Sequence, residues 1–219
     1  MTARGAYTAD RAAALAGVPK STVHYWARTG VLEPSVSPDR VKLWSYTDLV
    51  ALRFIYWLRQ PKRGGASADI PATSMPAVRK ALQALRDLDL DVWSPTDGPH
   101  LAVDRGGRVF LAPGDELQEA SGQMVAAQVL SLVEPFAEAA GIRGPDLARP
   151  RPDLRIVPGK LSGSPHVAGT RVETEALAAL EQRRFGVAQL KALYPYIGED
   201  DIGQALDLEH QLASNLRAA

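Results

Sequence analysis

The sequence contains no cysteine in 219 residues. This absence excludes disulfide frameworks, thiolate metal sites and cysteine nucleophiles, and it is typical of proteins that fold in a reducing compartment. No apolar run approaches the roughly 20 residues needed to span a bilayer, and the first residues do not have the pattern of a secretion signal. We therefore expect a cytoplasmic protein that has no membrane partner.

Net charge is absent as well, because 25 Lys and Arg balance 25 Asp and Glu. The balance conceals an asymmetry: residues 1–65 hold 10 basic and 4 acidic side chains, whereas residues 66–219 hold 15 and 21. A basic end suggests binding to nucleic acid, although the acidic remainder is also compatible with a solvated surface. The uneven spread of 16 prolines and 18 glycines predicts several small cores.

The basic end has the pattern of two short helices. Residues 9–16 are helical by composition, and Gly17 is placed to end that helix. Pro19 suits the first turn of a second helix over residues 20–28, which has Val23 and Trp26 on its apolar face and polar side chains on the other. The pair predicts a helix-turn-helix whose second helix enters a DNA major groove, the alternative being a helical hairpin with a solvated face.

Residues 34–44 then predict an extended pair around a turn, which would form a wing. A further helix is expected with Thr47 as its cap, running to Arg59, while Trp26 and Trp44 are expected in the core. The succession of helix, turn, helix, wing and capped helix favours DNA binding. The residues that we expect to contact DNA are Lys20, Ser21, Thr22, His24, Tyr25, Arg28, Arg40 and Lys42. Tyr25 and Arg28 are the residues most strongly expected to contact DNA, while Lys20, Ser21 and the two wing residues are expected to contact phosphates.

Short motifs recur in order along the first 60 residues: Tyr7-Thr8, Gly17-Val18, Ser21-Thr22-Val23, Tyr25-Trp26, Gly30-Val31-Leu32, Tyr46-Thr47-Asp48-Leu49 and Leu52-Arg53-Phe54-Ile55. This series resembles the DNA-binding domain of the MerR family, and the resemblance implies a winged helix-turn-helix. Family members usually carry an Arg-Tyr-Tyr-like triplet in the second helix and a Gly-Tyr-Arg-like turn in the wing. This chain has His24-Tyr25-Trp26 and Asp39-Arg40-Val41-Lys42 instead.

The middle of the chain shows no pattern that indicates chemistry. Residues 61–67 are rich in Pro and Gly and predict a hinge or loop. An apolar stripe between residues 76 and 89 predicts a helix that either packs on its own chain or contributes to a dimer. Residues 101–111 predict a β-hairpin around Gly106-Gly107, and residues 124–137 predict a further helix.

The last third begins with a proline-rich basic segment, residues 144–152, which predicts a domain boundary. A strand-like stretch at residues 154–157 and a turn at Gly169 precede three helical patterns. These patterns cover residues 173–184, 187–193 and 199–216 and predict a compact three-helix unit.

Several motifs of this region recur together, namely Pro165-His166-Val167-Ala168-Gly169-Thr170-Arg171-Val172, Arg184-Phe185-Gly186-Val187, Leu193-Tyr194-Pro195 and Asp200-Asp201-Ile202. Over residues 153–212 the chain resembles a small bacterial and archaeal domain family of unknown function that has a homeodomain-like three-helix fold. Members of that family occur in VapB-like antitoxins, often paired with PIN-type ribonuclease toxins. The resemblance implies an antitoxin of a type II toxin-antitoxin system that neutralises its toxin and represses its own operon.

The expected fold class is mainly α with small β elements (α+β). Its expected parts are a MerR-like winged helix-turn-helix over residues 1–60, a mixed connector and dimerisation region over 61–144, and a homeodomain-like three-helix module over 145–219. An inhibitor of a ribonuclease can place carboxylates on the basic RNA groove or an arginine in the acidic metal site, and both modes remain open. The candidate toxin contacts are Arg149, Arg151, Arg155, Arg171, Glu199, Asp200, Asp201, Asp207 and Glu209. For Arg171 a role in fixing its turn is the stronger expectation, and the acidic run at 199–201 also fits a helix N-terminus.

Neither catalytic residues nor a metal site is indicated. The histidines at positions 24, 100, 166 and 210 lack ligand spacing, and no phosphate-binding loop or nucleophile elbow is present. We therefore expect no enzyme and no cofactor. The alternative to an antitoxin is a one-component transcription regulator whose C-terminal part senses a ligand. Both functions predict operator DNA as a partner and a homodimer that reads an inverted repeat.

Overall fold

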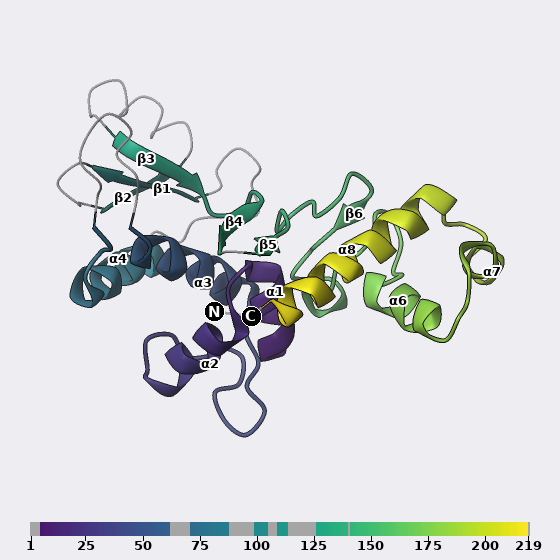
Figure 1. Cartoon of the computed structure of the whole chain (residues 1–219), viewed down its shortest axis with the longest axis horizontal. Coiled ribbons are helices and arrows are strands. Elements are labelled where there is room, and N and C mark those ends of the chain that lie inside the picture. The colour runs from purple at the N-terminus through teal and green to yellow at the C-terminus, as the bar shows by residue number, and fades with distance from the viewer. Residues whose placement is uncertain are drawn as a thin grey trace. The chain divides into compact units, whose positions relative to one another are not determined.

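The computed structural model describes residues 5–61, 71–87, 99–104, 109–113, 126–139 and 141–218 (Figure 1). Within these ranges the protein is mainly helical with small sheets, as the sequence predicts. Contacts between residues divide the chain into two compact units, one of Met1–Leu49 with Pro135–Ala219 and one of Val50–Glu134. The sequence predicts three consecutive parts, whereas in these two units the first and the last parts of the chain belong together.

The first unit opens with the expected helix and turn. Helix α1 (Ala9–Ala16) starts at Thr8, whose side-chain oxygen accepts a hydrogen bond from Arg11 N at 3.2 Å. It ends at Gly17, which has a φ of 69°. A Cβ on Gly17 would lie 2.8 Å from Gly144 Cα, so that both the turn and the packing require glycine.

Helix α2 (Lys20–Arg28) has the bounds that the sequence predicts, and α3 (Tyr46–Arg59) begins slightly earlier than expected. Asp48 N donates to Ser45 Oγ at 3.1 Å, and Ser45 N donates in return to Asp48 Oδ2 at 2.7 Å. The predicted cap at Thr47 is therefore wrong, because the residue that binds the backbone N–H three positions on is Ser45.

The rest of the first unit comes from the end of the chain. It contains β4 (Phe136–Ala139), β5 (Ile142–Gly144), β6 (Leu154–Arg155), the 3-10 turn η1 (Leu161–Gly163), β7 (His166–Val167), α6 (Thr174–Gln182), α7 (Val187–Leu193) and α8 (Glu199–Arg217). Strands β4 and β5 pair antiparallel, as do β6 and β7. The three predicted C-terminal helices are confirmed, and Leu177, Leu190, Ile202 and Leu212 are buried between them.

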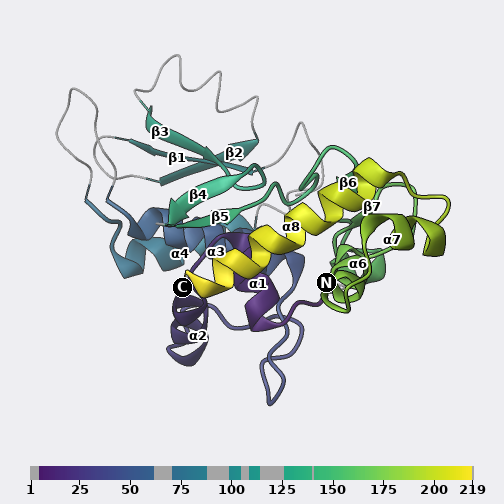
Figure 2. The same ribbon diagram turned by 45° about the vertical axis from the view of Figure 1, so that its right-hand side comes forward.

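The two ends of the chain pack on each other inside this unit. Helix α8 runs beside α1 in both views of the molecule (Figures 1 and 2). Asn215 of α8 donates from Nδ2 to the Ala14 carbonyl at 3.0 Å, and the Tyr7 hydroxyl donates to the Gly163 carbonyl at 2.8 Å. Burial raises the pKa of the Tyr7 phenol, which therefore stays a hydrogen-bond donor.

The second unit combines most of α3 with α4 (Met75–Asp87) and a three-stranded antiparallel sheet. The strands are β1 (Pro99–Asp104), β2 (Val109–Pro113) and β3 (Ala126–Ser131), in the order β2-β1-β3. Arg53 of α3 is fully buried, and its Nη1 donates to the carbonyls of Leu132, Val133 and Glu134 at 3.2, 3.1 and 2.7 Å. The predicted hairpin is confirmed by the pairing of Leu101 with Leu111, while its Gly106-Gly107 turn and residues 62–67 of the predicted hinge lie outside the described residues.

The helix predicted over residues 124–137 is wrong. Residues 126–131 form β3, which pairs with β1, and residues from Phe136 form β4. Pro135 lies inside the predicted helix, where it has no N–H to donate and its ring clashes with the preceding turn. Val129, Leu132 and Phe136 are spaced like residues on one face of a helix, but they belong to a strand, a bend and a second strand.

Candidate nucleic-acid interface

The exposed face of α2 is the candidate for contact with DNA. Val23 and Trp26 are buried and fix the helix on its own unit, and Trp44 is fully buried as well, so that the expected core tryptophans are confirmed. The opposite face leaves Ser21, His24, Tyr25 and Arg28 exposed, while Thr22 is half-buried. The structure therefore brings four of the predicted contact residues onto one free helix face.

Tyr25 and Arg28 form a pair on this face. The Tyr25 side chain is 53% exposed, and the Arg28 guanidinium carbon lies 6.0 Å from the centre of its ring. A guanidinium at this distance is attracted by the face of an aromatic ring. The contact holds the N–H donors of the Arg28 guanidinium beside the amphipathic Tyr25 ring. Both groups can reach base edges or phosphates.

Lys20 of α2 forms an ion pair with the preceding helix. Its Nζ lies 2.8 Å from one carboxylate oxygen of Asp10, on α1, and 2.9 Å from the other. Both side chains are about half exposed, so that solvent screens the pair and DNA phosphate can compete for Lys20. The pair joins two helices, so that the spacing of residues within either helix does not predict it.

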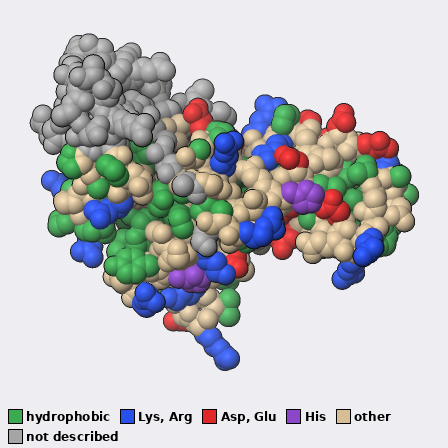
Figure 3. Space-filling model, viewed as in Figure 1, with side chains coloured by type: hydrophobic (Ala, Val, Ile, Leu, Met, Phe, Trp, Pro, Cys, Tyr) green, Lys and Arg blue, Asp and Glu red, His purple; other side chains and the backbone are tan. Residues whose placement is uncertain are grey.

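The wing is a short, irregular hairpin. Leu43 N donates to the Ser37 carbonyl at 2.9 Å and Ser37 N donates back at 3.1 Å. At the tip Arg40 is exposed, Val41 is 64% exposed and Lys42 is half-buried. Figure 3 shows Lys and Arg side chains (blue) and a histidine (purple) gathered over α2 and the wing, in the lower part of the view.

A buried carboxylate fixes the base of the wing. Asp48 is 5% exposed, and its Oδ2 accepts from Ser35 N at 2.9 Å and from Ser35 Oγ at 2.8 Å, in addition to Ser45 N. The same oxygen therefore caps α3 and anchors the start of the wing. The Ser-x-x-Asp spacing of residues 45–48 is the signal from which sequence analysis could have found this anchor.

Two helices joined by a tight glycine turn, with an exposed polar second helix and an anchored wing, define a winged helix-turn-helix of the DNA-binding class. Two comparisons agree with parts of the chain. Residues 7–65 match the family described as MerR HTH family regulatory protein, and residues 155–207 match the family described as protein of unknown function (DUF433). Comparison with curated proteins and with solved structures gave no match. The chain thus carries a MerR-type helix-turn-helix, which indicates DNA binding and transcription regulation, and a C-terminal DUF433 domain.

The predicted toxin contacts are scattered over the C-terminal part. Arg151 Nε pairs with Asp207 Oδ2 at 2.8 Å, Arg149 Nε donates to the Pro152 carbonyl at 3.0 Å, and Arg155 Nη1 donates to the same carbonyl at 2.9 Å. All four of these toxin-contact candidates therefore already form hydrogen bonds or an ion pair within the chain. Arg149 and Arg151 also line a hollow of about 590 Å³ together with Phe136 and Pro150.

Arg171 is exposed, so that the expectation of a turn-fixing arginine is wrong. The turn is closed by its neighbour, since Thr170 Oγ1 donates to the Val167 carbonyl at 2.9 Å and accepts from Val172 N at 3.1 Å. A hydroxyl can donate and accept at once within a tight turn, whereas a long guanidinium is free to extend into solvent.

The acidic candidates for toxin contact differ in their exposure and in their partners. Glu199 and Asp200 are exposed at the start of α8, while Asp201 accepts from Gly198 N at 2.9 Å as part of the helix cap. Glu209 is largely buried and binds Arg11, a contact that residue spacing could not predict. In the described part of the chain no cluster of His, Asp and Glu is arranged to hold a metal ion, and no helix is long and apolar enough to cross a membrane.

Proposed function

We propose that this protein is an autoregulating antitoxin, a regulator without enzymatic activity that binds operator DNA through α2 and the wing and a PIN-type ribonuclease through its DUF433 domain. The observation that carries the DNA-binding half is the exposed face of α2, where the Arg28 guanidinium lies over the Tyr25 ring and Ser21 and His24 are also exposed. The resemblance of the C-terminal part to VapB-like antitoxins supports the other half.

On DNA, Tyr25 and Arg28 reach base edges, and Ser21 with the wing residue Arg40 contacts phosphates. One such unit contacts too little DNA for strong specificity, so that the protein acts as a homodimer on an inverted repeat. Sedimentation of the full chain with and without DNA tests this, and a monomer under both conditions contradicts it.

The substitution Arg28→Ala tests the DNA interface. If Arg28 reads a base, binding to the DNA upstream of its own gene weakens by about 1–3 kcal/mol and loses sequence preference. If it contacts a phosphate, binding weakens on all sequences and the salt slope falls by about 1. Arg183→Ala is the matched control, because Arg183 is an exposed arginine at the end of α6. Equal loss in both variants removes Arg28 from the interface.

On the toxin, the side chains best placed to act are those that are exposed and that bind no other described residue, namely Arg171, Glu199 and Asp200. They represent the two contact modes. Loss of toxin binding in Arg171→Ala alone indicates insertion of an arginine into the acidic metal site, whereas loss in the double variant Glu199→Gln with Asp200→Asn indicates contact with the basic RNA groove.

Co-expression of the full chain with the product of the neighbouring gene tests the antitoxin role. Stable co-purification with loss of ribonuclease activity is the expected result, and failure to bind or inhibit overturns it. Removal of residues 1–60 is a poor test, because α1 packs on α8 and its loss would expose the core of the DUF433 domain. Arg28→Ala serves instead: it should lose operator binding and keep toxin neutralisation.

A second function, a one-component regulator that senses a small ligand, is favoured by one observation. A cavity of about 870 Å³ lies where α1, η1, α6 and α8 meet, so that its walls come from both the helix-turn-helix and the DUF433 domain. A ligand held there would contact the helix that precedes the DNA-reading helix. Retention of operator binding without any toxin partner supports this second function.

A further inference from the structure

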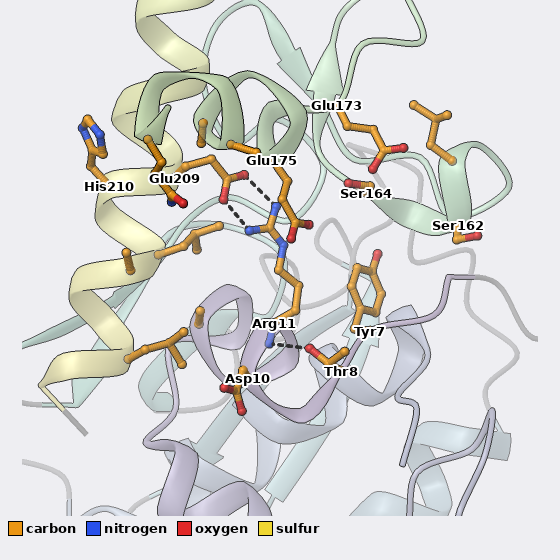
Figure 4. Close-up of a pocket in the computed structure, with 18 of the residues that line it drawn as sticks. Tyr7, Thr8, Asp10, Arg11, Ser162, Ser164, Glu173, Glu175, Glu209 and His210 are labelled. Atoms are coloured by element: carbon orange, nitrogen blue, oxygen red, sulfur yellow. Dashed lines mark hydrogen bonds and ion pairs between the residues drawn. The ribbon is translucent and has the colours of Figure 1, made fainter. Parts of the chain in front are cut away.

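The cavity between α1, η1, α6 and α8 has the form of a ligand site. Its volume of about 870 Å³ falls in the range of about 300–1,000 Å³ that small-molecule sites occupy. Figure 4 shows side chains from all four elements converging on it, with Arg11 and Glu209 joined at its centre and Tyr7 and Ser164 to one side. A site built from segments at opposite ends of the chain exists only in the folded protein.

One part of the cavity wall is apolar. Leu212 and Leu216 stand one turn apart on α8, and Ala178 of α6 and Ala14 of α1 complete the patch. The accessible part of this wall is Leu216, which is half-buried, together with the exposed Ala179 and Ala213, whereas Ala14, Ala178 and Leu212 are buried in the fold. A wall of this kind holds a hydrocarbon or aromatic body, since burial of apolar surface contributes about 25 cal/mol per Å².

The charged part of the wall is predominantly negative. Five carboxylates line the cavity, against the two guanidinium groups of Arg11 and Arg217; the carboxylates belong to Asp10, Glu173, Glu175, Glu181 and Glu209. Three of them are engaged, because Asp10 binds Lys20, Glu181 binds His210 and Glu209 binds Arg11.

The carboxylates of Glu173 and Glu175 have no hydrogen bond or ion pair among the described residues. In Figure 4 the Glu175 carboxylate lies on the side of the Arg11 guanidinium that faces away from Glu209. Glu209 binds Arg11 and the Glu175 charge also raises the pKa of Arg11, so that the carboxylates outnumber the guanidinium at this end of the cavity and leave it with a negative charge. An anionic ligand would be repelled here, whereas a cation would be attracted.

We propose that this cavity binds a small organic cation, a protonated amine attached to an apolar body. The ammonium donates to the carboxylates of Glu173 and Glu175, and the apolar body lies on Leu216, Ala179 and Ala213. The inference deepens the one-component regulator and rests on that function for its effect on DNA. Binding itself is measured without DNA, so that the two can fail separately.

Calorimetric titration of the full chain with 4-phenylbutylamine tests the proposal, with 4-phenylbutanol and 4-phenylbutyrate as neutral and anionic analogues of the same size. The amine is expected to bind at one site, the alcohol at least about tenfold more weakly, and the acid not measurably, because a charge-assisted hydrogen bond contributes about 1.5–3 kcal/mol. Equal binding of amine and alcohol, or no binding of the amine, overturns the proposal.

Two variants locate the site. Glu175→Gln should weaken amine binding about tenfold or more, because it removes one of the two carboxylates that accept from the ammonium, at a position that is exposed. Ala213→Lys should abolish binding, since residue 213 is exposed on α8 and lines the cavity, where a lysine supplies a competing ammonium. Glu134→Gln is the control, because Glu134 is exposed and does not line the cavity.

Wild-type amine affinity in both Glu175→Gln and Ala213→Lys would place the amine elsewhere and overturn the assignment. Operator affinity is then measured with and without a saturating amine. If the amine changes the operator affinity of the wild type but not that of Ala213→Lys, the result supports the sensing function, because binding at the cavity then alters binding at the DNA site. An unchanged operator affinity, with amine binding intact, overturns the sensing function and leaves the binding site supported.

Discussion

Arg11 and Glu209 lie 198 positions apart in the sequence and form a two-pronged ion pair: Nη1 donates to Oε2 at 2.5 Å and Nη2 donates to Oε1 at 2.7 Å. Their side chains are 17% and 10% exposed, and the Thr174 hydroxyl also donates to Glu209. Burial alone would lower the pKa of Arg11, but the hydrogen bond to Glu209 and the charges of Glu209, Glu175 and Tyr7 together outweigh burial and raise it. The pair joins α1 of the helix-turn-helix to α8 of the C-terminal domain.

Removal of one partner of this pair should be costly. Glu209→Ala leaves the Arg11 guanidinium largely buried and without the carboxylate that binds it, and we expect the free energy of unfolding to fall by about 3 kcal/mol. Urea denaturation followed by circular dichroism measures the change.

Asp207→Ala is the matched comparison, because it removes a carboxylate two residues away on the same helix. The Asp207 side chain is 69% exposed in its pair with Arg151, so that its loss should cost less than about 1 kcal/mol. Similar losses in the two variants would mean that the Arg11 pair does not join the two ends of the chain more firmly than a surface contact does.

Local signals explain why much of the fold could be predicted. Gly17 and Pro19 bracket a turn that leaves few alternatives for the residues on either side, and α1, α2 and α7 have the predicted bounds. The same kind of signal was available and was missed at Pro135, which excludes the helix predicted over residues 124–137. It was also missed at Ser45 and Asp48, whose spacing identifies the cap of α3.

The candidate sites could be predicted only where they are local. The exposed face of α2 follows from helical spacing within nine residues. The binding of Arg11 by Glu209 and the cavity beside it depend on contacts between opposite ends of the chain, which no spacing records. Glu209 was accordingly expected on a solvent-exposed partner surface and lies instead inside the fold.

Gly17 offers a second test of the packing between the first and the last part of the chain. Gly17→Ala should destabilise the protein strongly, because the new Cβ meets Gly144 N and lies 2.8 Å from Gly144 Cα. Gly169→Ala is the control, since Gly169 also has a positive φ, 74°, but nothing lies within 4 Å of its Cβ position. We expect about 1–2 kcal/mol for the backbone strain at Gly169 and a clearly larger loss at Gly17, measured by urea denaturation. Equal losses would show that β5 does not pack closely on the turn.

The Lys20 and Asp10 pair predicts a gain of function. Asp10→Asn removes the carboxylate that holds Lys20, and the freed ammonium should contact a DNA phosphate. Operator affinity should rise, and the slope of log affinity against log salt should become steeper by about 0.9. Filter binding at several salt concentrations measures both quantities.

Asp200→Asn separates this effect from a general change in charge, because Asp200 is exposed at the start of α8. It should leave affinity and slope unchanged. An equal rise in the two variants would assign the effect to net charge, and no rise in Asp10→Asn would mean that Asp10 does not restrain Lys20.

His166 should make the stability of the protein dependent on pH. The side chain is 1% exposed, and burial lowers its pKa below the ordinary value of about 6.5; Lys160 and Arg155 act in the same direction, while the Ser164 carbonyl and Glu173 oppose them. Well above pH 6.5 the residue is neutral in both states. As the pH falls below 6.5 the unfolded chain takes up a proton that the folded chain does not, so that stability decreases by up to about 1.4 kcal/mol per pH unit.

Urea midpoints measured between pH 7.5 and 5.5 test this, because Asp and Glu at their ordinary pKa values titrate mainly below that window. The midpoint should fall with pH in the wild type and in His210→Asn, since His210 is exposed, and it should fall less in His166→Asn. A pH dependence that is unchanged in His166→Asn would assign the proton uptake to another group. Loss of the dependence in His166→Asn alone would identify the neutral imidazole, held at Ser164 beside β7, as the group that ties folding of the DUF433 domain to pH.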